Sequence, residues 1–219
     1  RMGYLVTYIP GDVALAREWY GAKGEYRECL MYLSNIVDKQ FIANEFEQKE
    51  PVNEAINIIV GNSADPSNNH IETLTKLADY KEADIRLFVP LSYGDKKHAE
   101  KVISYGRQEF GEKFEPLTNF IPLNEYLNIL RTTDIAIFNH KRQQAMGNTI
   151  TLLGMGKTVY MRPDFTHTQF LSYLGITFYD VANFKLEKLD DEVATRNQHI
   201  IYKYFSKENL VKQLKYIFE

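Results

Sequence analysis

Short runs of hydrophobic residues alternate with longer amphipathic stretches along most of this chain. The short runs are typical of buried strands, and the stretches between them repeat at helical spacing. We expect strands at 55–61, 85–91, 115–121, 134–139, 158–163 and 176–180, and helices at 68–80, 96–111, 123–133, 148–156 and 167–175. Continuous apolar strands that alternate with helices predict a parallel sheet covered on both faces.

The two ends of the chain have a different pattern. Near the start, two short apolar runs at 4–10 and 29–33 predict strands, with a helix capped by Asp12 between them. The stretch 44–55 is polar and carries Pro51, which favours a linker. From 185 to 219 the pattern is amphipathic and helical.

These patterns together predict an α/β fold, a Rossmann-like doubly wound parallel sheet. Ligands of such sheets bind in the crevice beyond the carboxyl ends of the strands. The loops to examine are therefore those that follow strands, at 61–68, 90–95, 121–122, 139–148 and 162–168.

The first of these loops reads GNSADPSNN and follows a strand that ends near Gly61. Gly61 allows a sharp turn or a close approach to a ligand, and Asn62 and Ser63 offer hydrogen bonds. Asn68 or Asn69 could cap the helix that follows. These residues fit a phosphate-binding loop and fit equally a plain turn with a helix cap, so both interpretations stay open. The loop matches neither Walker A nor G-x-G-x-x-G.

A second loop, after the strand at 134–139, gathers cationic and amide side chains. Its polar residues and the start of the next helix are His140, Lys141, Arg142, Gln143, Gln144, Gly147, Asn148 and Thr149. A helix start offers free N–H groups and a positive dipole end, which attract anions. Because Lys141 and Arg142 stand just before it, we favour a diphosphate site over a solvated loop.

Other candidate residues carry weaker signals. Tyr93 and Tyr126 stand where they could flank a nucleotide base, although ordinary packing explains them as well. His140 has no serine or carboxylate partner beside it in sequence, which favours a structural role. No motif for a metal site is present, so we expect a metal-independent reaction without a cofactor.

Composition narrows the class of protein. The 219 residues carry a net charge of −3, which argues against general binding to nucleic acid. The single cysteine, Cys29, excludes an intrachain disulfide framework and reads as a small buried residue. No apolar stretch approaches the ~20 residues of a membrane span. We expect a cytoplasmic protein, and because the sequence opens without Met and almost at once on a strand, a fragment of a longer one.

Four segments resemble one enzyme family. They are IIVGNSADPSNNHI, LFVPLSYG, LNEYLNILRTTDIAIF and RQQAMGNTITLLGMGKTVYMRPD. In order and spacing they are similar to the C-terminal half of the TDP-N-acetylfucosamine:lipid II N-acetylfucosaminyltransferases, also called 4-alpha-L-fucosyltransferases, which are glycosyltransferases of GT-B architecture. The resemblance runs from about residue 2 to residue 205. The segment SYGDKKH is shorter and more basic than its family counterpart, and Asn148 replaces a smaller residue, which leaves the donor sugar open.

The resemblance implies an organisation and a reaction. Residues 1–52 would be the remnant of an acceptor domain and linker, 53–205 the donor-binding half of a GT-B enzyme, and 206–219 a helix that crosses back. The donor would be a TDP-sugar such as TDP-4-acetamido-4,6-dideoxygalactose, and the acceptor a polyprenyl-diphosphate-linked glycan of surface polysaccharide synthesis. The missing N-terminal part would bring the enzyme to the inner face of the cell membrane, and this chain would be inactive alone.

The resemblance also implies roles for single residues. Gly61, Asn62 and Ser63 match the first donor-side loop, and Arg142, Gln143 and Gln144 match the loop of basic and amide residues. Gly147 and Thr149 match the start of the phosphate-facing helix. Two alternatives remain, a GT-B enzyme that uses another nucleotide sugar and a non-enzymatic α/β binding domain.

Overall fold

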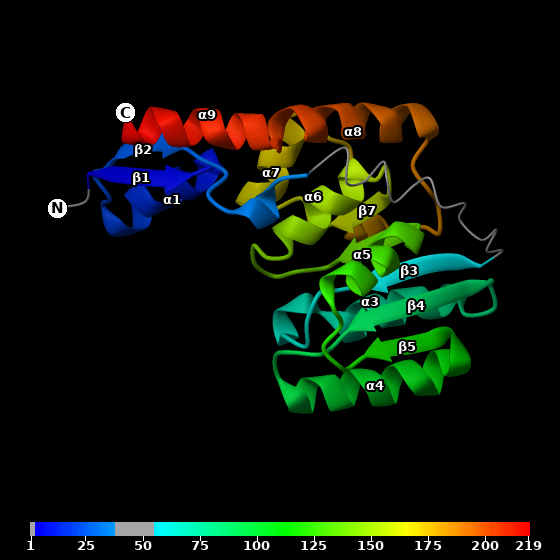
Figure 1. Cartoon of the computed structure of the whole chain (residues 1–219). Coiled ribbons are helices and arrows are strands. Elements are labelled where there is room, and N and C mark those ends of the chain that lie inside the picture. The colour runs from blue at the N-terminus through cyan, green and yellow to red at the C-terminus, as the bar shows by residue number, and fades with distance from the viewer. Residues whose placement is uncertain (1–2, 38–54) are drawn as a thin grey trace.

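The computed structural model describes residues 3–37 and 55–219. Its larger part is a six-stranded sheet in which every neighbouring pair is parallel (Figure 1). The strands are β3 (Ile56–Val60), β4 (Ile85–Pro90), β5 (Phe114–Leu117), β6 (Ile135–Phe138), β7 (Thr158–Met161) and β8 (Tyr179–Asp180). The helices that connect them are α3 (His70–Leu77), α4 (Lys96–Phe110), α5 (Leu123–Thr132), α6 (Met146–Gly154) and α7 (Thr166–Tyr173). The predicted α/β fold with a parallel sheet is confirmed.

The strand order creates the crevice in which ligands of such sheets bind. The order is β5-β4-β3-β6-β7-β8, so the chain builds outward in one direction from β3, then returns to β3 and builds in the other. The carboxyl ends of β3 and β6 therefore lie side by side, and the loops that leave them turn to opposite faces of the sheet. The sequence placed its two polar loops after these two strands.

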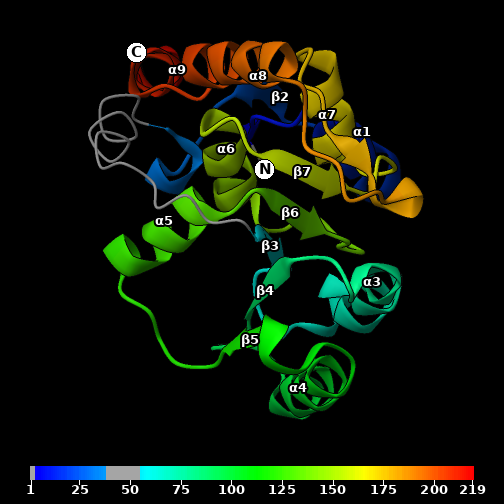
Figure 2. The same cartoon turned by 90° about the vertical axis from the view of Figure 1, so that its right-hand side faces the viewer.

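Alternate residues of the central strands enter two separate cores. Ile58 and Val60 pack with side chains of α3 and α4, whereas Ile59 packs with side chains of α6 and its neighbours. Figure 2 shows α3 and α4 on one side of the sheet and α5 and α6 on the other. Burial on both faces explains why these strands read as continuous hydrophobic runs.

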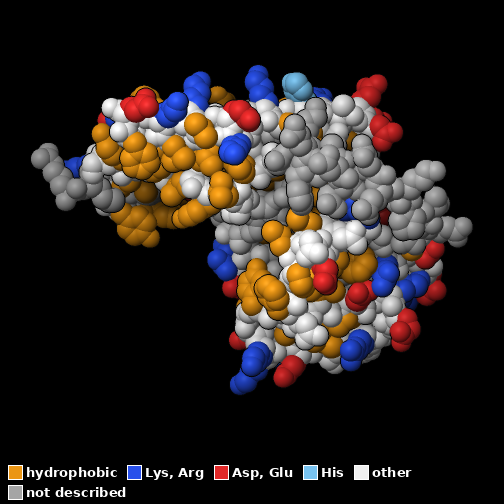
Figure 3. Space-filling model, in the orientation of Figure 1, with side chains coloured by type: hydrophobic (Ala, Val, Ile, Leu, Met, Phe, Trp, Pro, Cys, Tyr) orange, Lys and Arg blue, Asp and Glu red, His pale blue; other side chains and the backbone are white. Residues whose placement is uncertain are grey.

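The residues before 38 form a small unit of their own. Its strands β1 (Tyr4–Thr7) and β2 (Glu25–Glu28) pair in parallel, and α1 (Pro10–Tyr20) connects them. A single 3₁₀ turn (Leu33–Asn35) follows. Large apolar side chains remain exposed on this unit, including Trp19 and Tyr20. Figure 3 shows hydrophobic side chains gathered over this end of the molecule.

The C-terminal helices join the two parts. α8 (Asp191–Tyr204) packs on α6, and α9 (Lys207–Phe218) continues over the N-terminal unit (Figure 1). Glu28 in β2 accepts hydrogen bonds of 2.9 Å from the Tyr204 hydroxyl and from the Gln213 amide. The amide oxygen of Gln213 in turn accepts from the Leu30 backbone N–H at 2.9 Å. The bonds of Gln213 fix α9 against β2 and the residues that follow it.

Several local expectations differ from the structure. The second strand is at 25–28, not 29–33, because the buried residues Cys29 and Leu30 come after the β1–β2 pairing ends. Asp12 lies in the first turn of α1 and does not cap it, since the helix begins at Pro10. The stretch 185–189 is not helical, and helix α8 begins only at Asp191. Cys29 is buried as predicted.

The helix after the first polar loop also starts differently from the prediction. Asn69 occupies its N-cap position in a left-handed conformation, but its side chain makes no capping bond. Asn68 instead accepts a hydrogen bond of 2.9 Å from the Asn62 backbone N–H through its side-chain oxygen. The predicted linker falls largely on residues 44–54, outside the described part of the chain, so the boundary at 52/53 stays a prediction.

Candidate functional site

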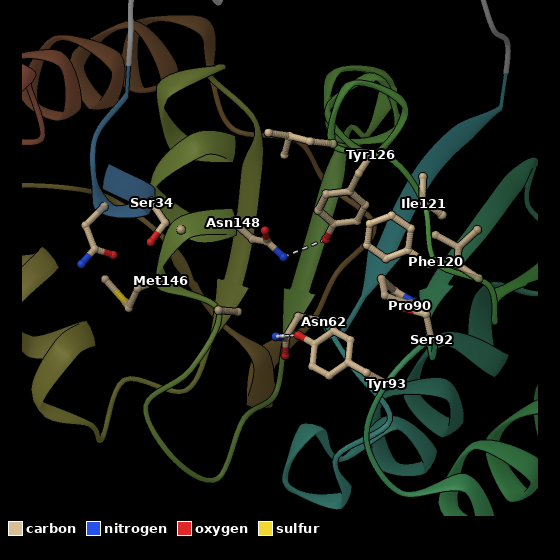
Figure 4. Close-up of a pocket in the computed structure, with 15 residues that line it drawn as sticks. Ser34, Asn62, Pro90, Ser92, Tyr93, Phe120, Ile121, Tyr126, Met146 and Asn148 are labelled. Atoms are coloured by element: carbon tan, nitrogen blue, oxygen red, sulfur yellow. Dashed lines mark hydrogen bonds between the residues drawn. The ribbon is translucent and has the colours of Figure 1, made fainter. Parts of the chain in front are cut away.

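A cavity of about 560 Å³ lies at the carboxyl edge of the sheet, between the ends of β4 and β5, helix α5 and the start of α6 (Figure 4). The N-terminal unit closes one side of it with Ser34 and Asn35. Phe120 and Ile121 face them from the loop that follows β5 (Figure 4). Its size is in the range of small-molecule and cofactor sites.

The lining of the cavity is aromatic, aliphatic and amide-rich. The described side chains that line it are Ser34, Asn35, Asn62, Pro90, Ser92, Tyr93, Leu117, Phe120, Ile121, Leu123, Tyr126, Ala145, Met146 and Asn148, with Gly147 adding only backbone. None of these side chains is charged. Such a surface suits a flat, neutral ring with hydrogen-bonding edges.

Two asparagine–tyrosine hydrogen bonds hold the polar side chains of the cavity. The Asn62 amide donates to the Tyr93 hydroxyl at 3.2 Å, and the Asn148 amide donates to the Tyr126 hydroxyl at 2.8 Å (Figure 4). Burial raises the pKa of Tyr126, so this hydroxyl stays protonated and can donate to a ligand. The carbonyl oxygen of Asn62 is buried and has no hydrogen-bond partner among the described residues.

The start of α6 reaches the cavity through Met146, Gly147 and Asn148. Ala145 precedes the helix in a left-handed conformation, and no side chain caps the first turn. A Cβ atom on Gly147 would lie 2.9 Å from the Ser34 carbonyl oxygen, so only glycine allows the N-terminal unit to approach this closely. The helix start therefore presents its backbone N–H groups and positive dipole end to the cavity.

The two polar loops are bound directly to each other. The Lys141 backbone N–H donates to the Ser67 carbonyl at 2.8 Å. Arg142 donates to the Ser67 hydroxyl at 3.1 Å and to the Asp65 carboxylate at 2.9 Å. Hydrogen bonds from Ser67, together with Arg142, lower the pKa of Asp65 to about 2. The two loops therefore form one hydrogen-bonded structure.

Buried histidines lie beneath these loops. Burial lowers the pKa of His70 and of His140 to about 3 and that of His167 to about 4. His70 lies 3.1 Å from His98 between ring nitrogens. A Cβ on Gly61 would approach the His70 ring nitrogen to 2.6 Å, and the φ angle of Gly61 is +69°. Gly61 is therefore required for backbone conformation and packing.

The predicted site residues fall into two groups. Asn62, Tyr93, Tyr126, Gly147 and Asn148 line the cavity. The remaining predicted residues are Gly61, Ser63, Lys141, Arg142, Gln143, Gln144 and Thr149, and they lie outside its lining. Ser63 and Thr149 are buried, whereas Lys141, Arg142 and Gln143 are exposed.

The sequence pattern missed several lining residues. Phe120 follows β5 as an aromatic side chain at a strand end, a signal that could have identified it. Ser34 and Asn35 belong to the N-terminal unit and carry no such signal. Their place in the site follows only from the packing of this unit against α6.

Solved structures of glycosyltransferases share this fold. A glycosyltransferase from Rickettsia africae aligns with a TM-score of 0.67 at 14% identity, covering 98% of this chain and 62% of that one. Sucrose-phosphate synthase from Thermosynechococcus elongatus aligns with a TM-score of 0.61 at 15% identity, covering 98% and 57%. The chain thus spans less than two thirds of their lengths.

The same comparison extends to a structure with a bound ligand. An E. coli trehalose-6-phosphate structure bound with UDP-2-fluoro glucose aligns with a TM-score of 0.59 at 10% identity, covering 90% of this chain and 52% of that one. At these identities the likeness shows the fold. The fold class is therefore that of the GT-B glycosyltransferases.

The particular family follows from the sequence itself. The 4-alpha-L-fucosyltransferases, glycosyl transferase group 56, match residues 4–209. This chain belongs to that family. No helix in 3–37 or 55–219 combines the length and apolar character that crossing a membrane requires.

Proposed function

We propose that the cavity binds the nucleoside diphosphate of a sugar donor, with the base among the aromatic side chains and the diphosphate at the start of α6. One observation carries this proposal. The uncharged, aromatic cavity ends at an uncapped helix N-terminus, so a single ligand with a neutral ring and an anionic group fits both. The membership in a glycosyltransferase family supports a sugar nucleotide as that ligand.

The lining favours a deoxyribonucleotide such as TDP. In dinucleotide-binding Rossmann sites, an aspartate or glutamate binds the ribose 2′-hydroxyl. The described residues that line this cavity include neither. Aliphatic side chains such as Ile121 and Leu123 could contact the methyl group of thymine. The E. coli structure with UDP-2-fluoro glucose shares the fold, so a UDP donor is the alternative within the same architecture.

The diphosphate would be stabilised without a metal ion in this proposal. The backbone N–H groups of Gly147 and Asn148 and the dipole of α6 supply positive potential at one end of the cavity. Lys141 and Arg142 add positive charge on the loop that leads into the helix. As the bond between the sugar and the diphosphate breaks, these groups would stabilise the electron pair left on the diphosphate.

The acceptor hydroxyl would form the new bond to the anomeric carbon and lose its proton to a general base. We propose that this base and most acceptor contacts belong to an N-terminal part beyond this chain, which would then be inactive alone. The acceptor would be a polyprenyl-diphosphate-linked glycan of surface polysaccharide synthesis, and the donor sugar 4-acetamido-4,6-dideoxygalactose. The enzyme would work in the cytoplasm at the membrane face.

A thermal-shift panel with TDP, UDP and GDP tests this function. A ligand that binds the folded state raises the melting temperature by mass action. We expect TDP to stabilise the chain most. A larger shift with UDP or GDP would favour another nucleotide sugar. No shift with any of the three would support a non-enzymatic α/β domain and overturn the proposal.

Calorimetry on one variant tests the placement of the diphosphate. Arg142→Ala should weaken TDP binding by about 1.5–3 kcal/mol, the usual range for hydrogen bonds to charged groups. Arg86→Ala is the matched control, since Arg86 is also half-exposed and paired with a carboxylate, but on β4 with Glu115 of β5. Equal TDP affinity for Arg142→Ala and the unaltered chain would remove Arg142 from the site.

A further inference from the structure

Two hydrogen bonds hold one edge of the Arg142 guanidinium group. Its Nε donates to the Ser67 Oγ at 3.1 Å, and its Nη2 donates to the Asp65 Oδ2 at 2.9 Å. Both partners lie in the turn that follows β3, 75 and 77 residues away in sequence. Two bonds along one edge fix the plane of the group as well as its position.

Asp65 is itself held in place. Its Oδ1 accepts from the Ser67 backbone N–H at 2.8 Å and from the Ser67 hydroxyl at 2.5 Å. These bonds keep it ionised, because they lower the pKa of Asp65 to about 2. The carboxylate therefore cannot turn away without breaking the helical turn that it caps.

The same turn also holds the loop that leads into α6. The Ser67 carbonyl accepts from the Lys141 backbone N–H at 2.8 Å, and its hydroxyl lies 3.2 Å from the Gln144 Oε1. Arg142 thus sits on a loop that is fixed on both sides of it. This loop ends at Ala145, which lines the cavity.

A guanidinium group carries five N–H donors on three nitrogens. In Arg142, the bonds to Ser67 and Asp65 use two of these nitrogens, Nε and Nη2. Within the described part of the chain, Nη1 has no hydrogen-bond partner. Nη1 and the second hydrogen of Nη2 form the end-on fork that matches two phosphate oxygens. The turn after β3 binds the Nε–Nη2 edge and does not engage this fork.

We propose that Asp65, together with Ser67, is a positioning residue that presets Arg142 for the diphosphate of the donor. This inference rests on the proposed function, because it names a partner for the same site. Asp65 acts by removing the rotational freedom that a long side chain would otherwise lose on binding. Arg142 keeps its bond to Asp65 when the ligand is bound.

Simple electrostatics gives the opposite expectation, which makes the proposal easy to test. A half-exposed carboxylate such as that of Asp65 repels a polyanionic ligand and reduces the net charge that Arg142 offers. If repulsion dominated, removal of Asp65 would strengthen TDP binding. If positioning dominates, its removal weakens binding although a negative charge is lost.

The experiment is calorimetric titration of the 219-residue chain and its variants with TDP. We expect Asp65→Ala to weaken binding by roughly fivefold to tenfold. Asp65→Asn should lose less, because an amide oxygen can still accept from Arg142 and cap the turn. In an Arg142→Ala background, Asp65→Ala should cause no further loss, since the residue would have nothing to position.

Glu115→Ala is the matched control, because Glu115 also pairs with a half-exposed arginine but at the β4–β5 edge. It should leave TDP affinity unchanged. Melting temperatures without ligand report whether each variant folds. If Asp65→Ala does not fold, the TDP affinity of Asp65→Asn tests the proposal instead. Unchanged or tighter TDP binding by the folded Asp65 variants would overturn this inference alone. Failure of the unaltered chain to bind TDP, UDP or GDP would overturn the proposed function and this inference with it.

Discussion

Tyr126 and Asn148 join helices α5 and α6 through a hydrogen bond of 2.8 Å at the wall of the cavity. The Asn148 amide donates and the Tyr126 hydroxyl accepts, so the hydroxyl hydrogen remains for a ligand. The two helices contact each other here, and Met146 and Gly147 lie in the same turn of α6. This bond therefore fixes the start of α6 relative to the aromatic side of the cavity.

Tyr126→Phe should lower the free energy of unfolding by about 1 kcal/mol, because it leaves the Asn148 amide without its acceptor. Urea titration of the variant measures this loss. Tyr93→Phe is the matched control, since Tyr93 bonds Asn62 at 3.2 Å but is 62% exposed. Equal stabilities for the two variants would show that the bond to Asn148 adds nothing.

Phe120→Ala should weaken TDP binding by about 1–3 kcal/mol without lowering the melting temperature of the free chain. Phe120 lines the cavity yet is 88% exposed, so it has little packing to lose and a free ring face to stack on a base. Phe218→Ala provides the control, because Phe218 is 82% exposed and lies at the end of α9. Unchanged TDP affinity in Phe120→Ala would show that the base does not stack on Phe120.

Gly147→Ala should destabilise the chain by about 1–3 kcal/mol and weaken TDP binding. The new methyl group would lie 2.9 Å from the Ser34 carbonyl oxygen, so the N-terminal unit or α6 must shift. Gly3→Ala meets no atom within 4 Å and should be neutral. Thermal melting and titration with TDP report both effects, and a Gly147 variant as stable as Gly3→Ala would contradict the close approach.

Stability should fall as the pH is lowered from about 6.5 toward 4. Burial lowers the pKa of His70 and His140 to about 3 and of His167 to about 4. In the unfolded chain these imidazoles have pKa values of about 6.5. The unfolded chain therefore binds more protons than the folded chain over this pH range. Each histidine should lower the free energy of unfolding at pH 5 by on the order of 2 kcal/mol relative to neutral pH.

Urea titrations at pH 7.5 and pH 5 measure this loss. His167→Gln removes one titrating group, so its stability should depend less on pH than that of the unaltered chain. His199→Gln serves as the control, because His199 is exposed on α8. Parallel pH profiles for both variants and the unaltered chain would contradict the role of the buried histidines.

Local hydrophobic periodicity was enough to predict the kinds of secondary-structure element and their order. The helix–strand alternation, the parallel sheet and the two polar loops after β3 and β6 all follow from local hydrophobic periodicity and turn residues. This was possible because the central strands β3, β6 and β7 are buried on both faces, which leaves a direct imprint on neighbouring residues. Where that imprint was weak, as at 29–33 and 185–189, the prediction was wrong.

The contacts that the loops make depend on the three-dimensional packing of the chain. Local pattern cannot show that Ser34 closes the cavity against Gly147, because the two residues are more than 100 positions apart. Nor can it show that Asp65 holds Arg142. Such contacts depend on how the chain returns to β3 and places β6 beside it. The residue types at the carboxyl edge of the sheet follow from the sequence pattern. The residues with which they form contacts depend on long-range packing.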